Sequence, residues 1–317
     1  MSPGFVVDAF LWRPVRKFAV VATARIWPRL ALGAAFCWAF CSVTAAAADD
    51  ATILRAMNQT LSQQLSHNQF QRPLVLVSVE SSSALKGDIY AVLDYPFASV
   101  NRSLNDPALG PANWCDVLIL HTNTKYCHAL TTGNGAVLKV NIGAKTEQVL
   151  ADSSRMEFQY HPVTSSTDYF KVELVAASGP MSTTNYRIVL EAVALDDRHT
   201  FLHLTYAYGY GFTGRIAMAG YLATVARNKV GFTLIRTQPV EYIAGLRGTV
   251  ERNSMRYYLA IDAYLASLAT APDKQLEQRL TRWFDSIEQY PRQLHDVERA
   301  DYMPMKYNEY RRQQTVQ

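Results

Sequence analysis

The 317-residue sequence lacks the motifs that identify the common classes of enzyme. Its four cysteines form no cluster of the kind that holds a structural metal. The chain has no Ser-His-Asp order, and Gly209-Tyr210-Gly211 does not match a nucleotide-binding fingerprint between a strand and a helix. No motif therefore assigns a reaction to this chain, and we expect neither a metal nor a cofactor.

An excess of charge is also missing from most of the chain. The sequence has 31 basic and 27 acidic residues, and the first 48 positions hold 5 basic residues and 1 acidic residue. The rest of the chain therefore carries 26 residues of each sign. Nucleic-acid-binding proteins need a basic face. We therefore expect no nucleic-acid partner.

The first 48 residues have the pattern of a targeting segment. Basic side chains precede an apolar run at Leu30–Val43, and Ala46–Ala48 supplies small residues where a signal peptidase needs them. The apolar run is shorter than the ~20 residues that a membrane-spanning helix needs. We predict a cleaved signal peptide over 1–48 and a periplasmic protein that begins near Asp49. A single membrane anchor is the alternative.

Two cysteines remain in the predicted mature chain, Cys115 and Cys127. A cysteine pair in an exported protein can oxidise to a disulfide, because the compartment favours oxidised thiols. Two buried thiols are the alternative at this point. No pattern of histidine and base accompanies either cysteine, so a catalytic thiol is not expected.

Most of the mature chain is predicted to form short strands joined by turns. A helix is expected first, over Asp49–Ser66, because apolar residues recur there every four positions. Regular short strands separated by turn signals favour an antiparallel, curved meander. The expected strands are Leu74–Glu80, Gly87–Tyr95, Val117–Leu130, Val137–Thr146, Met156–Val163, Tyr169–Ala176, Asn185–Leu195 and Thr200–Tyr210.

Helices are predicted at two points around these strands. Pro96 opens a short helix with Phe97 on its apolar face, Asn105-Asp106-Pro107 stops it, and Trp114 stands just before the next strand. After the last strand, a long helix is expected over Thr213–Ile235, with small residues along one side. Two more helices, Tyr242–Ala269 and Asp273–Tyr290, and a solvated tail, Tyr307–Gln317, should follow.

This order of elements resembles the START-like (SRPBCC, helix-grip) domains, in an exported bacterial form. The resemblance covers Leu74–Ile235 and implies an α+β fold in which a curved antiparallel sheet grips a long helix. The helices beyond residue 235 depart from the pattern. The expected divisions are a signal peptide (1–48), an N-terminal helix (49–72), a START-like domain (73–235) and a helical C-terminal extension (236–317).

The resemblance implies that a hydrophobic small molecule, such as a lipid, lies between the sheet and the long helix, and a peripheral membrane contact is compatible with such a ligand. Strand residues and the thin side of the helix are the candidates to line this space. The sequence leaves open which sheet face points inward, and charged side chains also suit an outer face. The candidate ligand-binding residues are Tyr169, Lys171, Glu173, Arg187, Glu191, Phe201, His203, Ala217, Gly220 and Tyr221.

Two other functions remain open from the sequence. A cyclase- or hydrolase-like enzyme would need an inward-facing titratable pair, for example His203 with Glu173. A structural envelope protein would have a filled core instead of a cavity. His199 and His203 would lie ~13 Å apart on a strand, so they should not share a metal ion. Binding without catalysis is the favoured reading.

Overall fold

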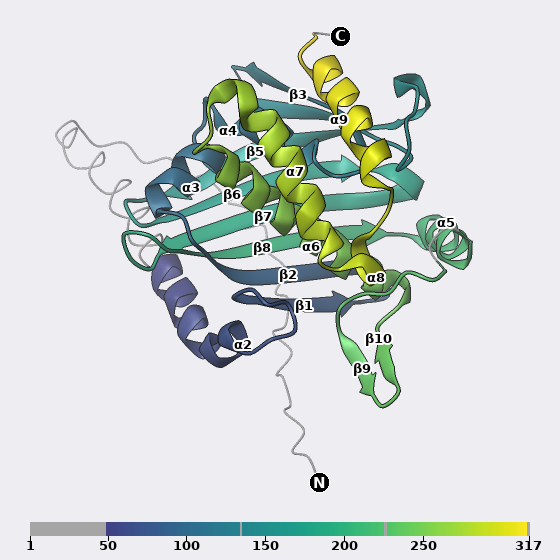
Figure 1. Cartoon of the computed structure of the whole chain (residues 1–317), viewed down its shortest axis with the longest axis horizontal. Helices are drawn as coiled ribbons and strands as arrows, with labels where there is room; N and C mark the ends of the chain where they lie inside the picture. The colour runs from purple at the N-terminus through teal and green to yellow at the C-terminus, as the bar shows by residue number, and fades with distance from the viewer. Residues whose placement is uncertain (1–48, 134, 225–226, 316–317) are drawn as a thin grey trace, which may run out of the picture. The chain divides into compact units, whose positions relative to one another are not determined.

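An eight-stranded antiparallel sheet organises the part of the chain that the computed structural model describes, residues 49–133, 135–224 and 227–315 (Figure 1). The order of the strands is β1-β2-β8-β7-β6-β5-β4-β3, so the last strand pairs beside the second. The predicted α+β class with an antiparallel sheet is confirmed. The strands are β1 Leu74–Glu80, β2 Ala84–Leu93, β3 Thr124–Thr132, β4 Gly135–Ile142, β5 Ser154–Ser165, β6 Tyr169–Ser178, β7 Thr183–Ala194 and β8 Thr200–Tyr210.

The register of these strands separates the side chains onto two faces. One row runs across β2, β8, β7 and β6 through Ile89, Leu204, Leu190 and Val172, all of which are fully buried. We call the face that carries this row the inner face and the opposite one the outer face. Successive side chains along a strand point to opposite faces of the sheet. The pairing of the strands therefore determines which residues belong to the inner face and which to the outer face.

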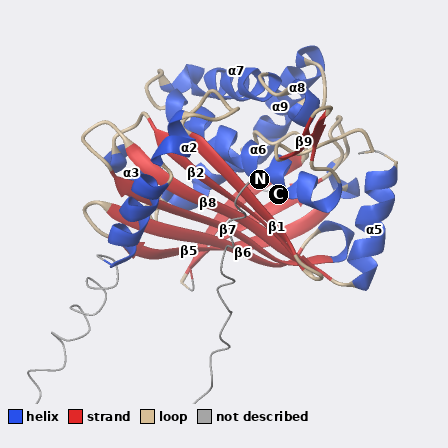
Figure 2. Ribbon diagram, turned by 90° about the horizontal axis from the view of Figure 1, so that it is seen from below, coloured by secondary structure: helices blue, strands red, loops and turns tan. Residues whose placement is uncertain are grey.

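The inner face is covered by helices from the C-terminal part of the chain (Figure 2). The helix that packs on the strands is α6, Gly245–Ser267, and α7, Gln275–Glu288, packs on α6. The short α8, Pro291–Leu294, and α9, Arg299–Gln313, complete this layer. Among the described helices, none has both the length and the apolarity needed to cross a membrane.

The helix predicted over Thr213–Ile235 starts close to the expected residue, but its predicted length is wrong and it is not the helix that lies on the sheet. A shorter helix, α5, spans Phe212–Ala223, and a hairpin of β9, Leu234–Thr237, and β10, Val240–Tyr242, follows it. The long helix on the sheet is α6, which lies beyond the expected domain boundary at residue 235. The physical reason is burial, since α6 buries residues on several sides against both the strands and α7, whereas most of α5 is exposed.

The segment between β2 and β3 is more helical than predicted. The short helix after Pro96 is present as α3, Phe97–Leu104, but a second helix, α4, spans Gly110–Leu118 and includes Trp114. The predicted strand from Val117 therefore starts only at β3. The indole Nε1 of Trp114 donates to the carbonyl of Leu104 at 2.9 Å and locks the two helices together. An apolar run that is buried on all sides does not distinguish helix from strand by its periodicity.

Cys115 of α4 and Cys127 of β3 form a disulfide, with their Cα atoms 5.2 Å apart. The bond joins the helical segment to the edge strand of the sheet. It lies in the core, since both residues are almost completely buried.

The C-terminal tail, predicted to be solvated from Tyr307, is instead part of α9. This helix continues through Pro304 and buries one face that carries charged side chains as well as apolar ones. Polar residues give the segment the composition of a surface tail, but the carboxylate of Glu309 is buried and paired with Lys125 and Lys306. The buried residues of this face are Tyr302, Met305, Lys306, Glu309 and Gln313.

The outer face of the sheet is partly covered by the N-terminal helical segment. Residues 49–60 and α2, Ser62–Ser66, are helical, which agrees with the helix predicted at the start of the mature chain. Ala51 and Leu54 pack against Tyr169, Val193 and Phe201 of the outer face. This second, smaller apolar cluster is separate from the main core.

Candidate ligand-binding site

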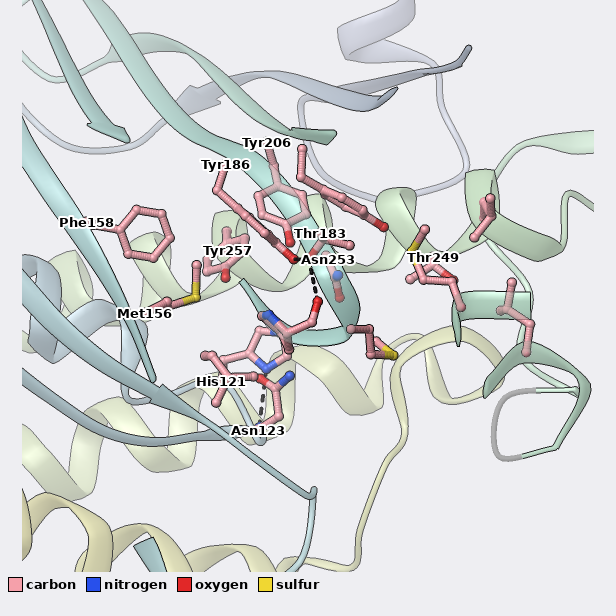
Figure 3. Close-up of a pocket in the computed structure, with 17 residues that line it drawn as sticks. His121, Asn123, Met156, Phe158, Thr183, Tyr186, Tyr206, Thr249, Asn253 and Tyr257 are labelled. Carbon is pink, nitrogen blue, oxygen red and sulfur yellow. Dashed lines mark hydrogen bonds between the residues drawn. The ribbon is translucent and has the colours of Figure 1, made fainter. Parts of the chain in front are cut away.

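A cavity of about 110 Å³ lies between the inner face of the sheet and α6 (Figure 3). We call it the inner chamber. Its walls come from β4, β5, β7 and β8, from α5 and α6, and from the turns that precede β3 and β7. The lining residues are His121, Asn123, Ile142, Met156, Phe158, Pro180, Met181, Thr183, Tyr186, Tyr206, Tyr208, Met218, Leu222, Leu246, Thr249, Asn253 and Tyr257.

Tyrosine rings form much of the wall of the inner chamber. Tyr206 and Tyr208 of β8 both point to the inner face, because they stand two positions apart on one strand. Tyr186 of β7 stacks on Tyr208 with ring centroids 5.1 Å apart, and Tyr257 of α6 approaches Tyr206 at the same centroid distance. The hydroxyl groups of Tyr186 and Thr183 are hydrogen-bonded at 2.7 Å. The wall is therefore apolar with fixed hydroxyl groups.

The imidazole of His121 lies at the edge of the inner chamber and is neutral. Burial, with a further contribution from the charge of Arg256, holds its pKa well below the ordinary value of a histidine. Its Nδ1 accepts a hydrogen bond from the backbone N–H of Asn123 at 3.4 Å, so the ring proton resides on Nε2. This places a neutral hydrogen-bond donor beside the aromatic wall (Figure 3).

The polar groups of the inner chamber are uncharged. Burial raises the pKa of Tyr206, Tyr208 and Tyr257 above the ordinary range of a phenol, so each keeps its proton. No Asp, Glu, Lys or Arg belongs to the lining among the described residues. Such a site binds apolar groups and orients them with neutral hydrogen bonds.

A second cavity, of about 700 Å³, adjoins the first, and we call it the outer chamber. The two chambers share lining residues, including His121, Asn123, Thr249 and Asn253, so one site extends through both. Charged side chains enter only in the outer chamber. They are Asp152 on the exposed rim and, deeper, Lys145, Arg252, Arg256 and Asp296.

Comparison with known proteins gives structural similarity only. No protein-family model and no curated protein matches the sequence. Norcoclaurine synthase from Thalictrum flavum is similar at a TM-score of 0.35 and 12% identity, over 60% of this chain and 100% of that chain. The Zhui aromatase/cyclase from Streptomyces sp. R1128 has a TM-score of 0.31 and 17% identity, over 45% and 86%. Human STARD10 has a TM-score of 0.28 and 8% identity, over 53% and 74%.

The topology of the chain itself decides the fold. Two short helices connect β2 to β3 of the antiparallel sheet. A long helix lies on the inner face, and the inner chamber lies between this helix and the sheet. This is a START-like helix-grip fold. The gripped helix is α6, and α7 to α9 form a further layer on it.

Most of the sequence-predicted ligand residues lie on the outer face of this helix-grip sheet. Lys171, Glu191 and His203 form one row across β6, β7 and β8, on the side opposite α6. Glu173 also lies on that side, where Arg187 binds its carboxylate at 2.9 Å. The proposed inward pair of His203 with Glu173 is therefore wrong. These charged side chains lie on the outer face of the sheet, which was the other position that the sequence left open.

These outer-face residues form a charge cluster centred on His203. Its Nε2 lies 2.9 Å from Asp88 Oδ1 and its Nδ1 lies 3.0 Å from Glu191 Oε2. The ring of Tyr90 stacks on the imidazole at 4.3 Å, and Tyr169 donates to Glu191 at 2.8 Å. Tyr169 and Phe201, two other predicted ligand residues, are buried beneath the N-terminal helix.

The ligand-binding residues predicted on the helix do not line the inner chamber. Ala217 and Gly220 are exposed on α5, and a side chain added at Gly220 would meet nothing within 4 Å. The side chain of Tyr221 is not among those that the structure describes. Met218 and Leu222 are the residues of α5 that line the inner chamber.

Several residues that line the site were not predicted from the sequence as ligand-binding residues. His121 and Asn123 fall within the predicted strand Val117–Leu130, but they lie in the turn that precedes β3. Thr249, Asn253 and Tyr257 lie on a helix that was expected outside the ligand-binding domain. They recur every four residues on α6 and so lie on one side of that helix, which is the signal that the sequence offers. Within the described ranges, no group of His, Cys, Asp or Glu has the arrangement of a metal site.

Proposed function

We propose that this protein binds a small molecule whose apolar part fills the inner chamber and whose polar part lies in the outer chamber. The observation that carries the proposal is the change from a tyrosine-lined, uncharged wall to a charged one within a single continuous site. A protein with a filled core would not leave such chambers, because protein interiors pack to crystal-like density.

The size of the inner chamber restricts the apolar part of the ligand. Its volume of about 110 Å³ is of the same order as the ~150 Å³ apolar cavity that holds a single benzene molecule in another protein, so the inner chamber has room for no more than one ring. One aromatic ring or a short alkyl segment matches this space. A lipid ligand would place only the end of its chain there and the rest in the outer chamber.

A filling substitution tests the proposal. In Leu222→Trp the larger ring should occupy the inner chamber and weaken the binding of phenylbutanol by about tenfold or more. Ala219→Trp adds a similar ring to the exposed side of the same helix, and it should leave the affinity unchanged. Titration calorimetry and melting curves are compared for the three proteins. Equal loss of affinity in both variants, or no binding of any apolar probe to the parent, would overturn the proposal.

We also propose that the protein acts in the periplasm after removal of residues 1–48. The basic and apolar pattern of that segment and the Cys115–Cys127 disulfide support an oxidising compartment. N-terminal sequencing of the cell-associated protein should give a chain that begins near Asp49. Detection of an intact Met1 in a membrane fraction would contradict the proposal.

A further inference from the structure

Cationic side chains outnumber carboxylates in the wall of the outer chamber. The cationic residues in this wall are Lys145, Arg252 and Arg256, and the acidic residues are Asp152 and Asp296. Asp152 is exposed at the rim, so solvent screens its charge. The side chain of Asp296 is buried, and Lys145 and Arg256 contact its carboxylate directly.

Asp296 is shared between two cations. Its Oδ1 lies 2.5 Å from the ammonium of Lys145, and its Oδ2 lies 2.8 Å from the guanidinium of Arg256. Burial would raise the pKa of Asp296, but the two positive charges lower it to about 2, so it is ionised. One carboxylate between two cations leaves one positive charge unbalanced.

The charge of Lys145 responds to this imbalance. Burial, reinforced by repulsion from Arg256, lowers the pKa of Lys145 to about 8, although Asp296 acts in the opposite direction. An additional anion in the outer chamber would stabilise the ammonium form, because opposite charges within a few ångströms favour ionisation.

Arg252 and Arg256 stand one helical turn apart on α6 and so share one side of that helix. Arg252 donates to the carbonyl of Val230 at 3.2 Å and to the hydroxyl of Thr249 at 3.0 Å. Both guanidinium groups are almost fully buried, which keeps their positions fixed and their charges poorly screened. Guanidinium groups match the geometry of carboxylate and phosphate oxygens.

The adjacent side of α6 carries Asn253 and Tyr257, which line the inner chamber. A molecule with its apolar end against Tyr257 therefore meets the cations at its other end. We propose that the ligand is an amphipathic anion, with a carboxylate or phosphate group held in the outer chamber by Lys145, Arg252 and Arg256. This inference rests on the proposed function and adds the charge of the ligand to it.

A matched set of probes tests the sign of the ligand charge. Phenylbutanoate, phenylbutyl phosphate, phenylbutanol and phenylbutylamine share one apolar part and differ in the other end. The two anions should bind at least about tenfold more tightly than the alcohol, which should exceed the amine. The ratio between the two anions identifies carboxylate or phosphate as the preferred group, and either preference supports the inference. Equal binding of alcohol and anions would overturn it while leaving the proposed function in place.

Two substitutions connect the preference to these side chains. Lys145→Gln and Arg252→Gln should each reduce the ratio of anion to alcohol affinity by about tenfold, because each removes one charge-assisted contact. Lys274→Gln removes an exposed charge at a position outside the chamber lining and should leave the ratio unchanged. The alcohol affinity and the melting curve show whether each variant is folded. An anion preference that survives in both chamber variants would contradict the assignment, and failure of all four probes would contradict the proposed function itself.

Discussion

The ammonium group of Lys306 donates a hydrogen bond to the backbone carbonyl of His121, with 2.7 Å between Nζ and O. This contact joins the last helix of the chain to the turn that carries the neutral histidine of the inner chamber. Lys306 also donates to the carbonyl of Thr124 at 2.8 Å and to Glu309 at 2.7 Å. Glu309 also accepts a hydrogen bond from the ammonium group of Lys125, with 2.9 Å between Oε1 and Nζ. A fully buried charge network therefore holds the turn in place.

Substitution of Lys306 by Met should strongly destabilise the protein. The change leaves the buried carbonyl groups of His121 and Thr124 without their donor, which typically costs about 1–3 kcal/mol for each group, whereas Glu309 keeps its contact with Lys125. Urea unfolding monitored by circular dichroism measures the free energy of unfolding. Lys274→Met, at an exposed position, is the control and should change it little. A loss of less than about 1 kcal/mol in Lys306→Met would show that the network is not needed for stability.

The outer-face cluster predicts a specific pH dependence of stability. Burial would lower the pKa of His203, but hydrogen bonds to Asp88 and Glu191 outweigh it and raise the pKa above 6.5. The stability that His203 contributes is therefore complete below pH 6.5 and is lost as the pH rises through the folded-state pKa. Burial would raise the pKa of Glu191, but His203 and Lys171 lower it to about 2, so its contribution is lost only as the pH falls from 4.5 toward 2.

His203→Gln should remove the alkaline part of this dependence. The urea concentration needed for unfolding at pH 8.5, relative to that at pH 5.5, should be higher in the variant than in the parent, because only the parent loses the contribution of His203 as the pH rises. His121 is present in both proteins, so its own titration cancels from the comparison. Equal differences between the two pH values in parent and variant would show that His203 is not the responsible group.

Reduction of the Cys115–Cys127 bond should lower the melting temperature. The two cysteines are 12 residues apart, and closing a loop of this length stabilises a folded chain by about 3 kcal/mol in the loop-entropy description. Calorimetry with and without a reducing agent measures the change. A Cys115→Ala, Cys127→Ala double variant should melt at a lower temperature than the oxidised parent and should not respond to the reducing agent.

Substitutions on the exposed side of α5 and on its chamber side should have different effects on the free energy of unfolding. Ala217→Leu adds bulk in solvent and should change the free energy of unfolding by less than about 0.5 kcal/mol. Met218→Ala removes a buried side chain from the wall of the inner chamber and should cost about 2 kcal/mol. If Ala217→Leu instead abolished the binding of phenylbutanol with unchanged melting, α5 would face the ligand through its thin side after all.

Local patterns in the sequence predict most of the individual elements. The helix at the start of the mature chain, the hairpin of β1 and β2, and strands β5 to β8 lie close to their expected positions. The helices α6 and α7 also form where apolar spacing predicted them. These elements follow from periodicity and turn residues, both of which are properties of neighbouring positions.

The site could not be predicted to the same extent. A strand with period-two alternation has the same pattern whichever face is covered, so the row through His203 suited a cavity wall as well as an outer surface. The composition of α5, with its small residues, suggested a gripped helix. Only the position of α6 against the strands shows that Asn253 and Tyr257 are the residues that line the inner chamber.

The sequence by itself determined the class of the fold, the order of its strands along the chain and the resemblance to a helix-grip domain. The tertiary structure decided which sheet face is inner, which helix covers it and whether the polar C-terminal segment is buried. The physical reason is that these choices depend on contacts between distant segments. Lys306 enters the core only because His121, Thr124 and Glu309 together satisfy its charge.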